Sequence, residues 1–191
     1  MLDNLEKYDV VLASNSPRRR ELLSELGVQY RVEVIRGIDE THPSELPAKE
    51  IAEYLSRLKA GAYALKQKEL LITADTVVIL DDEVMGKPAD ANEACAMLRR
   101  LSNRTHSVVT GVTVTTENGQ HSFSDEALVT FDDLSDEEIQ YYVNHYHPLD
   151  KAGAYGIQEW IGYMGVKHLD GSFFTVMGLP VHRLYQLLKT L

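Results

Sequence analysis

The stretch "YDVVLASNSPRRRELL", residues 8–23, decides the fold of the first part of the chain. Its apolar half predicts a buried strand. Ser16 followed by Pro17 predicts the start of a helix, because serine caps helix N-termini and proline suits the first helical position. Three arginines, Arg18, Arg19 and Arg20, then fill the first turn, where each exposed cation costs about 0.3–1 kcal/mol against the helix dipole. A phosphate bound at this strand–helix junction would compensate for that cost. The alternative is a solvated basic patch.

Composition is that of an ordinary soluble globular protein. The 191 residues are 44% hydrophobic and 25% charged, with a net charge of −10, which predicts one domain over residues 1–191. The acidic balance argues against nucleic acid and anionic lipid as partners, whereas a local basic site suits a small, highly charged anion. No run is apolar enough to cross a bilayer and no signal peptide is visible, so we expect a cytoplasmic protein. A single cysteine, Cys95, excludes an intrachain disulfide and a thiolate metal cluster.

Strand and helix patterns are mixed along the rest of the chain. We expect strands over 30–37 and 70–80, a helix over 47–67, a helix from Asp90 through Leu101, a hairpin around "ENG" at 117–119, a helix from Ser135 to His145, a glycine-rich loop over 147–158, a second hairpin around Asp170-Gly171, and a last helix from Pro180. This order predicts an α/β fold with a mixed, largely central β-sheet flanked by helices.

Asp75 interrupts the apolar run "LLITADTVVIL", residues 70–80. An ionised carboxylate in such a strand is costly unless it is paired, hydrogen-bonded or bound to a metal, so Asp75 is a candidate metal ligand or general base. The alternative is that Asp75 ends one strand and caps a turn. Lys59 at the edge of its helix, Lys87 beside Pro88 and Gln158 at the end of the glycine-rich loop are further candidates. Taken singly, each is more typical of a solvated surface.

Several motifs together resemble one family, the Maf nucleoside triphosphate pyrophosphatases. They are "ASNSPRRRELL" (13–23), "YLSRLKA" (54–60), "TADTVV" (73–78), "GKP" (86–88), "HSVVTGV" (106–112), "LDKAGAYGIQ" (149–158) and "VMGLP" (176–180). The resemblance implies a Maf/ITPase-like fold of two lobes with a cleft between them. It also implies cytoplasmic house-cleaning hydrolysis of a nucleoside triphosphate between its α and β phosphates, with Mg²⁺ or Mn²⁺ as cofactor. For partners, the resemblance implies a homodimer. We expect the protein to bind neither a membrane nor nucleic acid.

The resemblance also assigns roles to single residues. Asp75 would accept the proton of the attacking water and bind metal, together with Asp39 or Glu40. The phosphates would be held by Ser16, Arg18, Arg19, Lys59 and Lys87. Arg18, Thr76 and Gln158 are similar to the members that prefer dTTP and UTP, whereas members that prefer 7-methyl-GTP carry Trp, Gln and Glu there. Two other readings stay open: a pyrophosphatase for 7-methyl-GTP or for ITP and XTP, and a binding protein in septum formation and division control.

Overall fold

The computed structural model describes residues 2–191, which form a mixed α/β fold around a seven-stranded sheet. The strands are β1 (Asp9–Leu12), β2 (Arg31–Val32), β3 (Glu69–Leu80), β4 (Glu83–Met85), β5 (Thr105–Thr116), β6 (Gly119–Phe131) and β7 (Val166–Asp170). The helices are α1 (Pro17–Glu25), α2 (Ala48–Gly61), α3 (Ala91–Leu101), α4 (Asp136–Tyr146), α5 (Trp160–Gly165), α6 (Phe173–Met177) and α7 (Val181–Leu188), with short 3-10 turns at Asp3–Leu5, Pro148–Asp150 and Ala152–Ala154.

The sheet order is β2-β1-β3-β5-β6-β7, with β4 paired to β3. β1 lies parallel to both β2 and β3, whereas β4 pairs antiparallel with β3 and β7 pairs antiparallel with β6. The predicted mixed sheet is therefore confirmed. No helix in the described part of the chain has both the length and the apolar character that a membrane crossing requires.

The chain divides into two compact units, each assembled from separate segments. The first unit runs up to Asp75 and adds Thr110–Asp125 and Gly178–Leu191. The second consists of Thr76–Val109 and Glu126–Met177. Strands β3, β5 and β6 contribute residues to both units. The single domain and the cleft between two lobes stay predictions.

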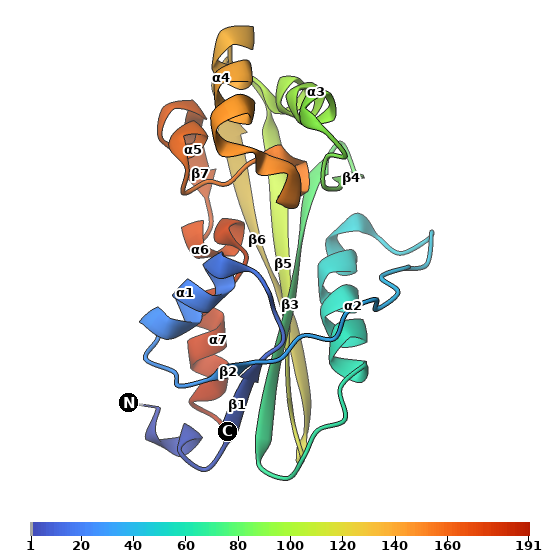
Figure 1. Ribbon diagram of the computed structural model, residues 1–191, viewed down its shortest axis with the longest axis vertical. Coiled ribbons are helices and arrows are strands. Elements are labelled where there is room, and N and C mark those ends of the chain that lie inside the picture. The colour runs from blue at the N-terminus through green and yellow to red at the C-terminus, as the bar shows by residue number, and fades with distance from the viewer. Residues whose placement is uncertain (1) are drawn as a thin grey trace. The chain divides into compact units, whose positions relative to one another are not determined.

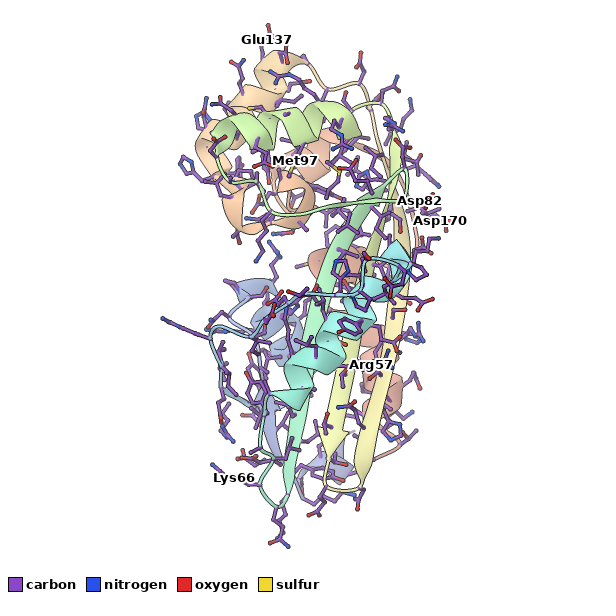
Figure 2. All side chains as sticks on the ribbon, turned by 90° about the vertical axis from the view of Figure 1, so that its right-hand side faces the viewer. Arg57, Lys66, Asp82, Met97, Glu137 and Asp170 are labelled. Carbon is purple, nitrogen blue, oxygen red and sulfur yellow. The ribbon has the colours of Figure 1, made fainter. Side chains whose placement is uncertain are left out.

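In the first unit, helices cover both faces of the sheet. Figure 1 shows α2 on one face and α1 with α7 on the other, and Figure 2, seen from the α2 side, shows α2 lying over the strands with Arg57 on its surface. The apolar side chains of β1 and β3 between them are buried; Leu12, Leu70 and Ile72 have no exposed surface. This burial fixes β1 and β3; the polar candidates lie in the loop that follows β1 and, as Asp75, within β3.

In the second unit, α3 packs beside α4 (Figure 1). Its core contains an aromatic cluster in which the rings of Phe131 and Tyr155 lie 5.0 Å apart and each lies 5.4 Å from His106. Tyr142 of α4 is fully buried. The glycine-rich loop after α4 contributes Tyr155 to this cluster.

The helix starts that the sequence predicts are confirmed. Ser16, Asp90 and Ser135 each accept a hydrogen bond from the backbone three residues on. Ser135 and Glu138 form a complete capping box. At α3 the matching Glu93 side chain bonds the backbone N–H of Ala89 instead.

The second predicted hairpin is wrong. The residues before Asp170 form α5 and then β7, and those after Gly171 form α6 rather than a strand. β7 takes β6 as its partner, pairing Asp170 with Leu128. Gly171, with φ of +120°, passes so close to β6 that a Cβ would lie 2.8 Å from the Cα of Ala127. The chain therefore leaves the sheet edge at this glycine and continues as α6.

Two other elements are shorter than the patterns predict. The strand over 30–37 is reduced to Arg31–Val32, and the helix over 47–67 ends at Gly61. Tyr63 explains the short strand, because its hydroxyl donates to the carbonyl of Glu33 and accepts from the backbone N–H of Ile35, each at 3.0 Å. A side chain thus bonds backbone groups that a longer β2 would have paired.

Candidate active site

The junction between β1 and α1 has the geometry that the sequence predicts. Ser16 is extended, with φ −61° and ψ 118°, and its hydroxyl accepts from the backbone N–H of Arg19 at 3.5 Å. Pro17 occupies the first helical position. The buried hydroxyl of Ser14 accepts from the backbone N–H of Ser16 at 3.2 Å. Two serines therefore shape the loop that opens α1.

Two of the three arginines of α1, Arg19 and Arg20, bind different partners. Arg20 turns back to the loop, donating to the Ser14 carbonyl at 3.4 Å and to the Asn15 side chain at 3.1 Å. Arg19 donates from Nε to the carbonyl of Gly178 at 2.8 Å and from Nη1 to Ser14 Oγ at 3.5 Å. Arg19 therefore links α1 to the "VMGLP" segment far along the chain.

Arg19 also lies within electrostatic reach of two acidic side chains. Loss of surrounding water is the largest influence and lowers the pKa of its guanidinium; the carboxylate of Asp75 acts against this and raises it. Arg18 lowers the pKa of Arg19 further, and Glu40 raises it. The basic loop and the carboxylates of the first unit thus form one electrostatic cluster.

Lys59 and Asp75 form the centre of this cluster. Lys59 Nζ lies 2.5 Å from Asp75 Oδ1 and 3.2 Å from Glu40 Oε1. The side chains of Lys59 and Asp75 are only 16% and 14% exposed, whereas that of Glu40 is 52% exposed. Because β3 runs without a break through Asp75, the alternative in which Asp75 ends a strand is wrong.

Asp39 and Glu40 differ in what they contact. The carboxylate of Asp39 accepts from the backbone N–H of Thr41 at 3.0 Å and from its hydroxyl. These hydrogen bonds lower the pKa of Asp39. Glu40 instead reaches Lys59. Of the two neighbours, Glu40 is the one beside Asp75.

The donors present fit a hard divalent cation. The carboxylates of Asp75 and Glu40 converge on one cationic nitrogen, and carboxylate oxygens are the ligands that Mg²⁺ and Mn²⁺ prefer. Residues 2–191 contain no group of three or more His, Cys, Asp or Glu side chains able to hold a metal by themselves. The remaining ligands would therefore be water and phosphate oxygens, as is common for Mg²⁺.

In the second unit, two sequence candidates lie on connected loops. Lys87 is exposed in the turn after β4, and the neighbouring Gly86 carbonyl accepts from the backbone N–H of Gly153 at 3.0 Å. Gly153, with φ of +65°, packs so closely on Val78 that a Cβ would lie 3.0 Å from it. The Gly-Lys-Pro turn and the loop that leads to Gln158 are thereby held together.

A buried polar network supports the end of that loop. Tyr142 Oη donates to Glu159 and accepts from the backbone N–H of Gly156 at 3.0 Å. Lys151 is buried, with Nζ 2.8 Å from Asp150 and 3.3 Å from Glu159. Beside this network, Gln158 Oε1 is buried without a hydrogen-bond partner in the described chain. A buried acceptor of this kind is costly unless a ligand donates to it.

The candidate residues thus divide between the units. Among those in the first unit, Arg19, Glu40, Lys59 and Asp75 share one electrostatic cluster, and Ser16 caps the helix that carries Arg18 and Arg19. Thr76, Lys87 and Gln158 belong to the second. Sequence reasoning missed Ser14, Gly178, Tyr142 and Glu159. A serine two residues after a strand and a tyrosine on the apolar face of a helix are signals for two of them, because a buried hydroxyl needs a partner.

Known proteins resemble this chain over its whole length. The profile described as "Maf-like protein" matches residues 9–191. The "dTTP/UTP pyrophosphatase" of Phocaeicola vulgatus is 58% identical over 193 residues, covering 100% of both chains, and that of Bacteroides thetaiotaomicron is 56% identical with the same coverage. That of Flavobacterium johnsoniae is 44% identical, covering 99% of this chain and 98% of its own.

Among solved structures, the Staphylococcus aureus Ham1 protein aligns with a TM-score of 0.46 at 18% identity, covering 65% of this chain and 72% of its own. A family profile that spans nearly every residue, and relatives that match from end to end, show that this chain belongs to the Maf family.

Proposed function

We propose that this chain hydrolyses dTTP and UTP to the monophosphate and pyrophosphate. The observation that carries the proposal is the cluster of Arg19, Lys59, Asp75 and Glu40 in the first unit. Cations and carboxylates beside a helix N-terminus suit a metal-bound triphosphate. The names of the full-length relatives supply the substrate.

The basic residues bind the phosphates in this proposal. At the start of α1 the hydroxyl of Ser16 donates to a phosphate oxygen, the helix dipole favours the negative charge, and Arg18 and Arg19 add guanidinium donors that can bind oxygens in pairs. Lys59 and Lys87 contribute point charges. Because negative charge accumulates on pyrophosphate as it leaves, these cations stabilise the transition state more than the bound substrate.

Asp75 is the group that prepares the attacking water. Its carboxylate orients the water and accepts a proton as the water oxygen bonds to the α phosphorus, while the bond from that phosphorus to the α–β bridging oxygen breaks. Asp75 and Glu40 would hold the divalent cation, which supplies charge neutralisation of the phosphates when bound. Glu40 is preferred over Asp39 because it already shares Lys59 with Asp75.

Gln158 reads the base in this proposal, together with Arg18 and Thr76. Uracil and thymine present a ring N–H between two carbonyls. Gln158 Oε1 accepts from that N–H and Nε2 donates to a carbonyl, which gives the orphaned acceptor its partner.

The test is a substrate panel of dTTP, UTP, CTP, dATP, GTP, ITP, XTP and 7-methyl-GTP with Mg²⁺ or Mn²⁺, with pyrophosphate and monophosphate both measured. Preference for dTTP and UTP is the expected result. Preference for 7-methyl-GTP, ITP or XTP would keep the chemistry and overturn the substrate. A folded protein that turns over no nucleotide would overturn the enzyme and favour a binding role in division control.

A further inference from the structure

A chain of hydrogen bonds joins four hydroxyl residues of the first unit, three through their hydroxyls and the fourth through the backbone carbonyl of Ser56. Ser56 Oγ is 2.7 Å from Thr113 Oγ1 on β5, which is 2.9 Å from Ser122 Oγ on β6. Thr73 Oγ1 on β3 donates to the backbone carbonyl of Ser56 at 2.7 Å. We call these four residues, Ser56, Thr73, Thr113 and Ser122, the hydroxyl chain. It ties one helix to three strands.

The donors of the hydroxyl chain have one consistent assignment. Ser56 Oγ donates to the carbonyl of Glu53 at 2.8 Å, and a hydroxyl has a single hydrogen to give. Thr113 must therefore donate to Ser56, and Ser122 to Thr113. Ser56, Thr73 and Thr113 are completely buried, so removing a member leaves a buried polar group without its partner.

A second feature presses α2 against the sheet at the same place. A Cβ on Gly111 of β5 would lie 2.3 Å from the backbone of Ala52, so the helix approaches this strand as closely as backbones allow. Ala52 and Ser56 lie one turn apart on α2, and both are fully buried. The helix is thus seated by steric contact at one turn and by hydrogen bonds at the next.

Lys59 and Asp75 lie close to this contact along the same helix and the same sheet strand as Ser56 and Thr73. Lys59 follows Ser56 by three residues and therefore shares its helix face, and Asp75 follows Thr73 by two and therefore shares its strand face. The bond from Thr73 to Ser56 lies beside the 2.5 Å contact between Lys59 and Asp75. We infer that the hydroxyl chain sets the register of α2 on β3, and that Thr73 and Ser56 are positioning residues for the Lys59–Asp75 pair.

This inference rests on the proposed function for its kinetic consequence. A displacement of about 1 Å in a catalytic group can cost on the order of 100-fold in rate. Replacing Thr73 with valine keeps the shape and removes the donor to Ser56. We expect kcat/KM for dTTP to fall by at least about 10-fold, mainly through kcat. Thr73→Ser, which keeps the hydroxyl, should stay within about threefold of wild type.

A double-mutant cycle separates positioning from general loss of stability. In a Lys59→Met background the pair is already gone, so Thr73→Val should lower kcat/KM less than about twofold further. Equal losses in both backgrounds would overturn the inference. Thr105→Val is the matched control, because Thr105 forms a hydroxyl pair with Thr130 in the second unit and should leave kcat unchanged. If Thr73→Val does not fold, Ser56→Ala replaces it in the same cycle.

A measurement that does not depend on turnover tests the inference independently of the enzyme assay. The side-chain ammonium resonance of Lys59 in ¹⁵N NMR, assigned by its loss in Lys59→Met, reports the contact with Asp75. It should shift in Thr73→Val and return in Thr73→Ser. An unchanged resonance would overturn the inference even if the wild type hydrolyses dTTP. A wild type without turnover would contradict the proposed function alone.

Discussion

Replacing Asp75 with asparagine should separate activity from stability. The substitution keeps the size of the side chain and removes one negative charge beside Lys59, whose Nζ lies 2.5 Å from the carboxylate. We expect turnover of dTTP to fall by about 10²–10⁴-fold, because asparagine can neither accept the proton of the attacking water nor neutralise a metal ion as a carboxylate does.

The expected loss of stability is much smaller. Leaving one partner of a fully buried ion pair uncompensated costs about 3–5 kcal/mol. Here Lys59 keeps a second anion, Glu40, at 3.2 Å, and that carboxylate is 52% exposed and open to solvent. The residual imbalance should therefore cost about 1 kcal/mol, which lowers the Tm of a chain of this size by about 2–4 °C.

The assay is pyrophosphate release from dTTP at saturating Mg²⁺, with thermal unfolding followed by circular dichroism on the same preparations. Asp9→Asn is the matched control, because Asp9 is an exposed carboxylate that pairs with Arg31 in the same unit. It should retain activity within about twofold. An Asp75→Asn protein within about tenfold of wild-type turnover would refute the role given to Asp75.

Three further outcomes follow from other sites. Gln158→Glu should lower the ratio of dTTP to GTP turnover by about tenfold, measured as pyrophosphate release, because a carboxylate cannot donate to a ring carbonyl; an unchanged ratio would remove Gln158 from base selection. Tyr142→Phe should cost about 1–3 kcal/mol in denaturant unfolding, because the buried N–H of Gly156 loses its acceptor; an unchanged midpoint would contradict this. Burial lowers the pKa of His106 to about 4. Below the ordinary histidine pKa, the unfolded chain therefore binds a proton that the folded chain does not, and the free energy of unfolding should fall by about 2 kcal/mol from pH 7 to pH 5 in a pH series of denaturant unfolding. His106→Gln should lack that fall.

Local chemistry made much of the fold predictable. The caps at Ser16, Asp90 and Ser135, the hairpin around "ENG" and the buried strand through Asp75 depend on neighbours in sequence, and the structure confirms them. The second hairpin failed because the contact of Gly171 with Ala127, and not the local pattern, decides where the chain turns.

The sequence predicted which residues belong to the candidate site, but it did not predict which of them contact one another. Asp75 and the arginines carry a local signal, since a carboxylate in an apolar strand and cations at a helix start both need compensation. Nothing in the sequence indicated that Arg19 would bond the carbonyl of Gly178, or that Glu40 and not Asp39 would reach Lys59. Those contacts join residues far apart in the chain. The homodimer stays a prediction.

The segmented make-up of the first unit has a consequence for synthesis on the ribosome. Its last segment, Gly178–Leu191, holds both the carbonyl that receives Arg19 and helix α7. A nascent chain adds residues from the N-terminus, and native contacts can form only between parts already made. The loop that opens α1 is translated before Gly178, so Arg19 can be held in place only once the chain has been made as far as Gly178. A chain that stopped before Gly178 would carry every proposed catalytic side chain and lack the carbonyl that holds Arg19.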